Sequence, residues 1–147
     1  MRRLLKDALF ISLLVFLDRL AKFWALNSLK EGLNLGFFRF YLVRNTGTLF
    51  GLGRGFNLVW IATSLIIGAI VLISFASERK SLGVWGYCGF VGIISGAFSN
   101  LCDRFLYGGV IDFIDIRILP VFNLADIFIT AGVILLGVWY LFLNPRK

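Results

Sequence analysis

The sequence predicts an all-α membrane protein with four transmembrane helices and a small extracytoplasmic β-sheet or hairpin. Its 147 residues are 59% hydrophobic and 16% charged, with a mean hydropathy of +0.90. Soluble proteins, by contrast, are about 45–50% apolar and about 25% charged. Four apolar stretches are also long enough to cross a hydrocarbon layer of about 30 Å, which takes roughly 20 helical residues. We therefore expect one integral membrane domain over residues 1–147.

The predicted spans are residues 8–26, 57–76, 83–102 and 121–143. The second and third contain no charged residue, and the fourth contains only Asp126. The first is interrupted by Asp18, Arg19 and Lys22. A cleavable secretory signal is the alternative for residues 1–26, but these charges and the lack of a clear small-residue cleavage site count against it.

The distribution of charge predicts the orientation. Lys and Arg are concentrated in residues 1–7, 77–82 and 144–147 and are sparser in the longer segments 27–56 and 103–120. Cytoplasmic connections carry the excess of Lys and Arg, so we expect both termini in the cytoplasm and the functional segments on the outer side. The net charge of +7 suits contact with anionic lipid headgroups. The basic residues are too dispersed for a nucleic-acid surface, so no nucleic-acid partner is expected.

Both outer segments carry strand signals. Residues 37–43 are aromatic and β-branched, and Asn45 and Gly47 follow them, which is typical of a strand or hairpin that ends in turns. Residues 110–118 follow a Gly-Gly pair and form a second short strand in this prediction. Within it, Asp115 is expected on a polar strand face with Arg117.

Three of the predicted helices have a small or polar stripe at about 100° per residue. The stripe of the first contains Asp18, Ala21, Lys22 and Ala25; that of the third contains Gly89, Gly92, Gly96, Asn100 and Asp103; that of the fourth contains Asn123, Asp126, Thr130 and Gly137. Polar side chains in a membrane span face the bundle interior, so the stripes are expected to meet there. Because four helices can bury these stripes internally, we expect a monomer.

Two carboxylates are placed to come together at the outer boundary. Asp126 is expected roughly 8 Å below the outer end of its span, at 1.5 Å per residue, and Asp112 lies in the connection above it. Two carboxylates in contact share one proton near neutral pH, which leaves one base and one acid. Such a pair can activate a water molecule and protonate a leaving amide nitrogen.

Other chemistries are weighed against this one. The sequence has no His, which excludes Ser-His-Asp and Cys-His catalysis and zinc sites with His ligands. A Ser-Lys dyad would need Ser28 or Ser99 beside a Lys. Asp126 could also be a structural ion-pair partner or the proton or cation site of a transporter. The i,i+4 pair of Asp18 and Lys22 favours a structural role. From the residues alone, a membrane aspartic peptidase and a small transporter both remain open.

A set of motifs distinguishes the two. DRLAK at 18–22, NTGTLFG at 45–51, SNLCDR at 99–104, VIDF at 110–113 and FNLAD at 122–126 resemble, in order and spacing, the motifs of the lipoprotein signal peptidases, bacterial signal peptidase II. The resemblance implies an aspartic endopeptidase of the bacterial inner membrane that needs no metal or other cofactor. Its expected substrates are prolipoproteins, cut just before a cysteine that carries diacylglycerol.

The resemblance also implies roles for individual residues. The catalytic dyad falls on Asp112 and Asp126. Supporting or substrate-positioning roles fall on Asn45, Gly47, Asn100, Asp103, Arg104, Asn123, Asp18 and Lys22. One departure is that Thr48 and Leu49 stand where family members commonly have Ala-Ala, which concerns the shape of the substrate cradle. The G-x-G-D motif of other intramembrane aspartyl proteases does not occur in the sequence.

Overall fold

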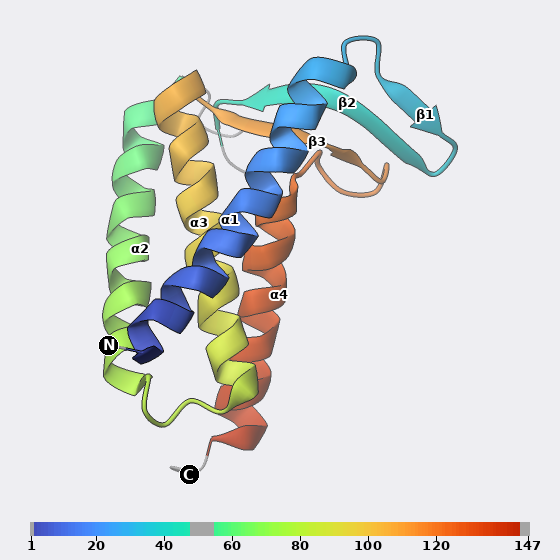
Figure 1. Cartoon of the computed structure of the whole chain (residues 1–147). Helices are drawn as coiled ribbons and strands as arrows, with labels where there is room; N and C mark the ends of the chain where they lie inside the picture. Colours follow the sequence, from blue (N-terminus) through green and yellow to red (C-terminus); the bar gives the residue numbers. More distant parts are fainter. Residues whose placement is uncertain (1, 48–54, 145–147) are drawn as a thin grey trace.

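The structure is a computed structural model that describes residues 2–47 and 55–144. Within these ranges it contains a helical bundle and a small sheet at one end of the bundle (Figure 1). The elements are α1 (Arg2–Ser28), β1 (Leu33–Leu35), β2 (Phe38–Asn45), α2 (Asn57–Glu78), α3 (Val84–Tyr107), β3 (Val110–Asp115), α4 (Leu124–Val138) and a π-helical continuation, η2 (Trp139–Leu143). Thr48, Leu49 and the rest of residues 48–54 lie outside the described part.

Three helical segments are long and apolar enough to cross a membrane within the described part of the chain. They are Asn57–Glu78, Val84–Tyr107 and Leu124–Leu143, with mean hydropathies of 2.5, 1.2 and 2.1. Their outward side chains are large and apolar, including Leu65, Ile66, Ile73, Phe98, Val133 and Ile134. A soluble bundle would not leave such a continuous apolar surface in water, so this is a membrane protein.

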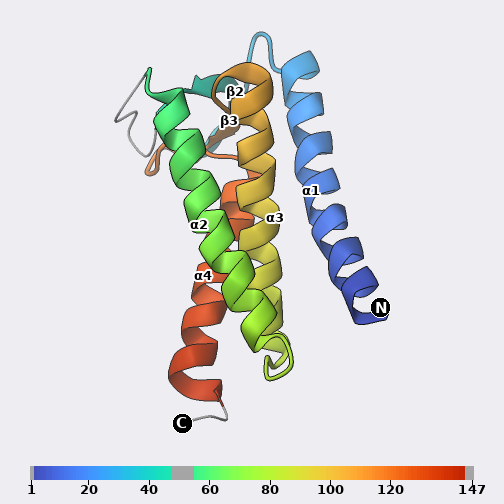
Figure 2. The ribbon, with the colours of Figure 1, turned by 90° about the vertical axis from the view of Figure 1, so that its left-hand side faces the viewer.

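The centre of the bundle is α3, which contacts α1, α2 and α4 (Figure 2). Its glycine stripe packs directly on α4. A Cβ at Gly92 would lie 2.8 Å from the carbonyl oxygen of Phe128, and one at Gly96 would overlap the carbonyl oxygen of Ala125. The predicted glycine stripe of α3 is therefore confirmed as a surface for close helix contact.

The predicted stripe of the fourth helix is partly wrong. Thr130 is exposed, and nothing lies within 4 Å of a Cβ built at Gly137. The small residues of α4 that face α3 are Ala125 and Gly132, seven residues apart and so on one helix face. The prediction grouped residues by polarity, whereas the contact with α3 depends on side-chain size.

The sheet is antiparallel, in the order β1-β2-β3. It confirms the two predicted strand regions, and it projects sideways from the bundle (Figure 1). After β3 the chain returns along the sheet: Phe122 accepts from the backbone N–H of Ile114 at 2.8 Å and donates back at 3.0 Å. This bridge fixes where α4 begins relative to β3.

The sequence predicted that Asp115 and Arg117 share the polar face of a strand over residues 110–118, but β3 ends at Asp115, so Arg117 lies outside it. Asp115 does have a charged partner on its strand face, and that partner comes from β2. Asp115 is buried and pairs with Arg39 of β2 at 2.5 Å. Arg39 is its cross-strand partner in the ladder, which places the two side chains on one face. The register between distant strands decides this pairing, and the local sequence pattern does not encode it.

Candidate active site

The site begins at the start of α4. Asn123 caps the helix: its Oδ1 accepts from the backbone N–H of Asp126 at 3.0 Å, and Asp126 Oδ2 accepts from the backbone N–H of Asn123 at 3.1 Å. This reciprocal arrangement is a capping box. Asp126 therefore lies in the first turn of α4. The prediction that the span starts at residue 121, with Asp126 well below its end, is therefore wrong. The chain before Asn123 is extended against β3, and the helix begins only at Leu124.

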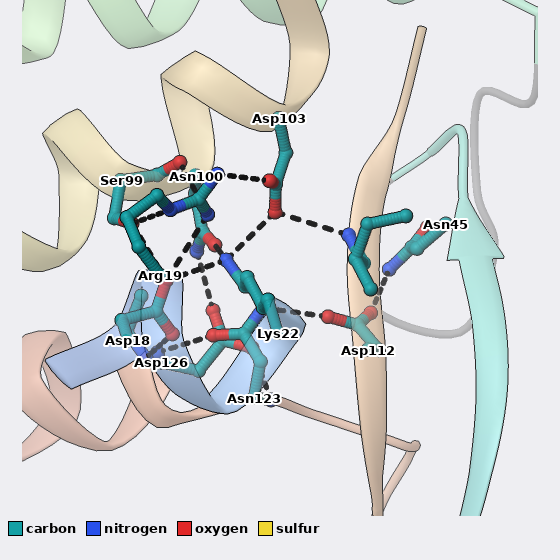
Figure 3. Close-up of polar contacts among 12 residues, drawn as sticks. Asp18, Arg19, Lys22, Asn45, Ser99, Asn100, Asp103, Asp112, Asn123 and Asp126 are labelled. Carbon is teal, nitrogen blue, oxygen red and sulfur yellow. Dashed lines mark hydrogen bonds and ion pairs between the residues drawn. The ribbon is translucent and has the colours of Figure 1, made fainter. Parts of the chain in front are cut away.

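Asp112 reaches the same point from β3. Its side chain is 2% exposed, and its Oδ1 accepts from the side-chain amide of Asn123 at 2.7 Å (Figure 3). Asn123 thus donates to both carboxylates, to Asp112 through its side-chain amide and to Asp126 through its backbone N–H. The structure brings together the two aspartates that the sequence singled out.

The register of β2 against β3 places the side chain of Asn45 beside Asp112. Val43 pairs with Asp112 across the sheet, and Asn45 shares the face of Val43 because strand side chains alternate. Asn45 Nδ2 donates to Asp112 Oδ2 at 3.1 Å. Its Oδ1 accepts from the backbone N–H of Gly47 at 3.1 Å, which leaves the amide NH₂ to face Asp112.

Burial raises the pKa of Asp112 to about 7, and the nearby charge of Asp126 adds to the effect. The hydrogen bonds from Asn45 and Asn123 act in the opposite direction because they favour the ionised form. The net result is a carboxyl group that gains and loses a proton near neutral pH. A group with this property can act as either an acid or a base in catalysis.

Lys22 orients Asn100, which in turn orients Asp126. Asn100 Oδ1 accepts from Lys22 Nζ at 2.9 Å and from Asn123 Nδ2 at 3.1 Å. With its oxygen so occupied, Asn100 directs its amide NH₂ at Asp126 Oδ1, at 2.8 Å. Both Asp126 oxygens therefore have a fixed donor.

Lys22 is itself held by two buried carboxylates. Its Nζ lies 2.8 Å from Asp18 and 2.7 Å from Asp103. The predicted pair of Asp18 and Lys22 is confirmed, and Asp103 joins it from α3. The Nζ contacts of Lys22 are with carboxylate and amide oxygens and not with a serine hydroxyl, which does not favour a Ser-Lys dyad at this position. Ser99, one of the two serines considered for that dyad, donates its hydroxyl to Asp18 at 2.6 Å.

Arg104 is placed differently from the other predicted residues. Its backbone carbonyl accepts from Asn57 Nδ2 at 3.2 Å, which ties the end of α3 that leads into β3 to the start of α2. Within residues 2–47 and 55–144, its half-buried guanidinium makes no ion pair with a carboxylate. It is therefore available for another partner.

Sequence reasoning missed two members of the cluster, Arg19 and Ser99. Both lie within the motifs at 18–22 and 99–104, but neither was given a role: Arg19 was otherwise noted as a charge in the first span, and Ser99 as a possible nucleophile. In the structure the two are hydrogen-bonded to each other, and both contact Asp18.

The described residues contain no group of three His, Cys, Asp or Glu side chains arranged to hold a metal ion.

The sequence matches the family described as Signal peptidase (SPase) II over residues 10–142, nearly the whole chain. The chain belongs to the signal peptidase II family. Its relatives include the lipoprotein signal peptidases of Syntrophomonas wolfei, 41% identical over 92% of each chain, and Clostridioides difficile, 35% identical over 95% of this chain and 97% of that one. That of Nostoc punctiforme is 38% identical over 82% of this chain and 80% of its own.

Two solved structures described as bacterial membrane enzymes share the fold. One superposes with a TM-score of 0.79 at 27% identity and covers 97% of this chain and 91% of its own. The other has a TM-score of 0.81 at 26% identity and covers 93% of both chains. Signal peptidase II enzymes are aspartic proteases. The membership therefore favours the peptidase over the transporter that the residues alone left open.

Proposed function

We propose that this chain is a membrane aspartic endopeptidase that removes signal peptides from diacylglyceryl-modified prolipoproteins by cutting before the lipidated cysteine. The observation that carries the proposal is the junction at Asn123, which bonds to both Asp112 and Asp126. Membership of the signal peptidase II family supplies the reaction, and the junction supplies two carboxylates that can share one proton.

The proposed reaction uses the pair as acid and base. The ionised carboxylate takes a proton from a water molecule, whose oxygen attacks the carbonyl carbon of the scissile bond. The protonated carboxyl gives its proton to the carbonyl oxygen, which forms a tetrahedral intermediate. The C–N bond then breaks, the leaving nitrogen takes the proton that came from water, and the carbonyl oxygen returns its proton to the pair. The dyad ends in its starting state.

The surrounding residues take supporting roles in this proposal. Asn45 and Asn100 hold the two carboxylates in place by donating to the oxygens that Asn123 leaves free. Lys22, with Asp18 and Asp103, keeps Asn100 in the required orientation. The remaining two predicted residues are Gly47, which fixes the amide of Asn45, and Arg104, which we assign to the carbonyl groups of the substrate because its guanidinium is available.

We also propose that α1 is a fourth membrane span. Its 27 residues extend about 40 Å at 1.5 Å per residue, enough to cross the hydrocarbon layer. Its buried charges pair with α3, while its exposed side chains include Leu9, Leu13, Phe16, Leu20 and Phe23. Charged residues in a span are tolerated when they face the protein interior and pair there.

The proposed orientation puts both termini in the cytoplasm and the dyad at the outer face of the bacterial inner membrane. Two features support it: the sequence concentrates Lys and Arg at the termini, and α1 begins and η2 ends at the bundle end opposite the sheet (Figure 1). Apolar side chains exposed on the sheet suit the lipid interface, namely Leu33, Leu35, Phe37 and Phe38. In this proposal the substrate and its acyl chains enter sideways from the lipid, into a single copy of the enzyme.

A gel-shift assay tests the proposal. The purified chain in detergent is incubated with a diacylglyceryl-modified prolipoprotein and, in parallel, with the unmodified precursor. We expect cleavage of the lipidated substrate alone, unaffected by EDTA and lost in Asp126→Asn. If the wild type cuts neither substrate, the peptidase proposal is wrong, and ion-coupled uptake in vesicles would test the transporter.

A further inference from the structure

Arg19 and Ser99 join α1 to α3 beside the dyad without contacting it. Arg19 Nε donates to Ser99 Oγ at 3.0 Å, and Arg19 Nη2 donates to the Ser99 carbonyl at 3.2 Å. Ser99 is fully buried, whereas the Arg19 side chain is 26% exposed. A guanidinium that uses two of its nitrogens on one residue has a defined orientation, unlike a lysine ammonium.

The same two side chains fix a pair of buried carboxylates. Arg19 Nη1 lies 2.7 Å from Asp103 Oδ1, and its Nη2 lies 3.2 Å from Asp18 Oδ2. Ser99 Oγ donates to that Asp18 oxygen at 2.6 Å. Asp103 Oδ1 has no hydrogen-bond partner among the described residues, so the Arg19 guanidinium is its compensating charge there (Figure 3).

Each of these carboxylates holds the backbone next to a dyad aspartate. Asp18 Oδ1 accepts from the N–H of Ala125, at 2.8 Å, and Ala125 directly precedes Asp126. Asp103 Oδ2 accepts from the N–H of Ile111, at 3.1 Å, and Ile111 directly precedes Asp112. The two dyad aspartates are therefore held through their backbones by two carboxylates from α1 and α3.

The cluster is balanced in charge only when Arg19 is present. Asp18 and Asp103 carry two negative charges, and Lys22 and Arg19 carry two positive ones. Without Arg19, one buried negative charge has no compensating cation, which is costly in a poorly solvated site. Asp103 Oδ1 also loses the contact that holds it, so this side chain can shift, and such a shift displaces the backbone N–H of Ile111 to which Asp103 is bonded.

We propose that Arg19 and Ser99 are positioning residues for the reaction. They act through Asp18 and Asp103 to set the separation of Asp112 and Asp126. The inference rests on the proposed function, since it assumes that these two aspartates are the dyad. Both residues lie within the motifs at 18–22 and 99–104, but the resemblance assigns them no role, and this inference supplies one.

The test compares Arg19→Gln, Arg19→Lys and Ser99→Ala with a control, Arg79→Gln. Arg79 makes a similar bond with Asp7, at 2.8 and 2.6 Å, but joins α1 to α2 far from the dyad. For each purified variant, kcat and KM are measured on a diacylglyceryl-modified prolipoprotein, and Tm is measured in the same detergent. Wild type and Asp112→Asn are included in every series.

We expect Arg19→Gln to lower kcat about 10- to 100-fold, because small errors in the placement of reacting groups have effects of this size, and to leave KM within about twofold. Arg19→Lys keeps the positive charge but lacks the planar guanidinium that donates to several partners at once. Its kcat should therefore fall between those of Arg19→Gln and wild type. Ser99→Ala removes one hydrogen bond and should lower kcat about fivefold. Arg79→Gln should lower Tm alone.

Two results would overturn the inference: kcat of the folded Arg19→Gln or Ser99→Ala protein within twofold of wild type, or an equal loss of kcat in Arg79→Gln. If Arg19→Gln does not fold, the kcat of Ser99→Ala alone tests the inference, because this variant keeps the four charged side chains of the cluster. Asp112→Asn separates this inference from the proposed function. Normal turnover in Asp112→Asn would show that Asp112 and Asp126 are not the catalytic pair, and the proposed function would then be wrong.

Discussion

The side-chain amide of Asn123 donates a 2.7 Å hydrogen bond to Asp112. The same residue begins α4 and exchanges two hydrogen bonds with Asp126. A helix cap thus also links the two carboxylates, so the geometry of the proposed dyad follows from where α4 starts.

Asn123 variants should separate these two roles. Asn123→Ala loses the cap, which costs about 1 kcal/mol, and the bond to Asp112, so both Tm and kcat should fall. Asn123→Asp keeps a good capping side chain but replaces the donor to Asp112 with a negative charge. We expect it to retain most of the helix stability and to lose at least about 100-fold in kcat. Full activity in Asn123→Asp would show that the bond to Asp112 is not needed.

Removing either carboxylate should abolish turnover. Asp112→Asn and Asp126→Asn should each lower kcat by about 10³-fold or more, because removing one half of a unit removes the function of the whole. The double variant should be no worse than either single one. A series of kcat values in which the two effects multiply would instead indicate that the aspartates act independently.

Asp112 should make stability depend on pH in a defined direction. Because its pKa is raised in the folded state from 3.8 to about 7, the folded protein binds more protons than the unfolded chain between about pH 4 and 7. This contribution is fully present below pH 4 and is lost as the pH rises through 7. Asp112→Asn removes the titrating group, so Tm of the variant relative to wild type should rise from pH 4 to pH 8. A constant or falling difference would contradict the raised pKa.

Much of the site could be predicted because its residues occur in short motifs of fixed order. Asp112, Asp126, Asn123 and Asn100 meet in the structure as the motifs implied. The glycine stripe of α3 was predictable for a different reason, since helical periodicity places Gly89, Gly92 and Gly96 on one face. Local pattern was sufficient in both cases.

Relationships between elements could not be predicted. Ser99 is one small residue in a glycine-rich helix, and only the packing of α1 on α3 brings it to Arg19. The pairing of Asp115 with Arg39 depends on a strand register that includes an irregularity between Phe40 and Val43. The depth of Asp126 was misjudged because apolar composition alone does not show where a helix begins. The cap at Asn123 does.

The contact between α3 and α4 leads to the last prediction. Gly96→Ala places a Cβ against the carbonyl oxygen of Ala125, a backbone atom in the first turn of α4 that cannot rotate away. The start of α4, with Asn123 and Asp126, must then move relative to α3. We expect a loss of about 1–3 kcal/mol in the free energy of unfolding, typical of overpacking, together with a lower kcat.

Gly137→Ala is the matched control, because nothing lies within 4 Å of the added methyl group and alanine favours the helix. Its Tm should equal or exceed that of wild type, and its kcat should be unchanged. Both variants carry the same chemical change on the same helix pair, so a difference between them reports the α3–α4 contact alone. Equal behaviour of Gly96→Ala and Gly137→Ala in Tm and kcat would mean that the close approach of these helices does not position the site.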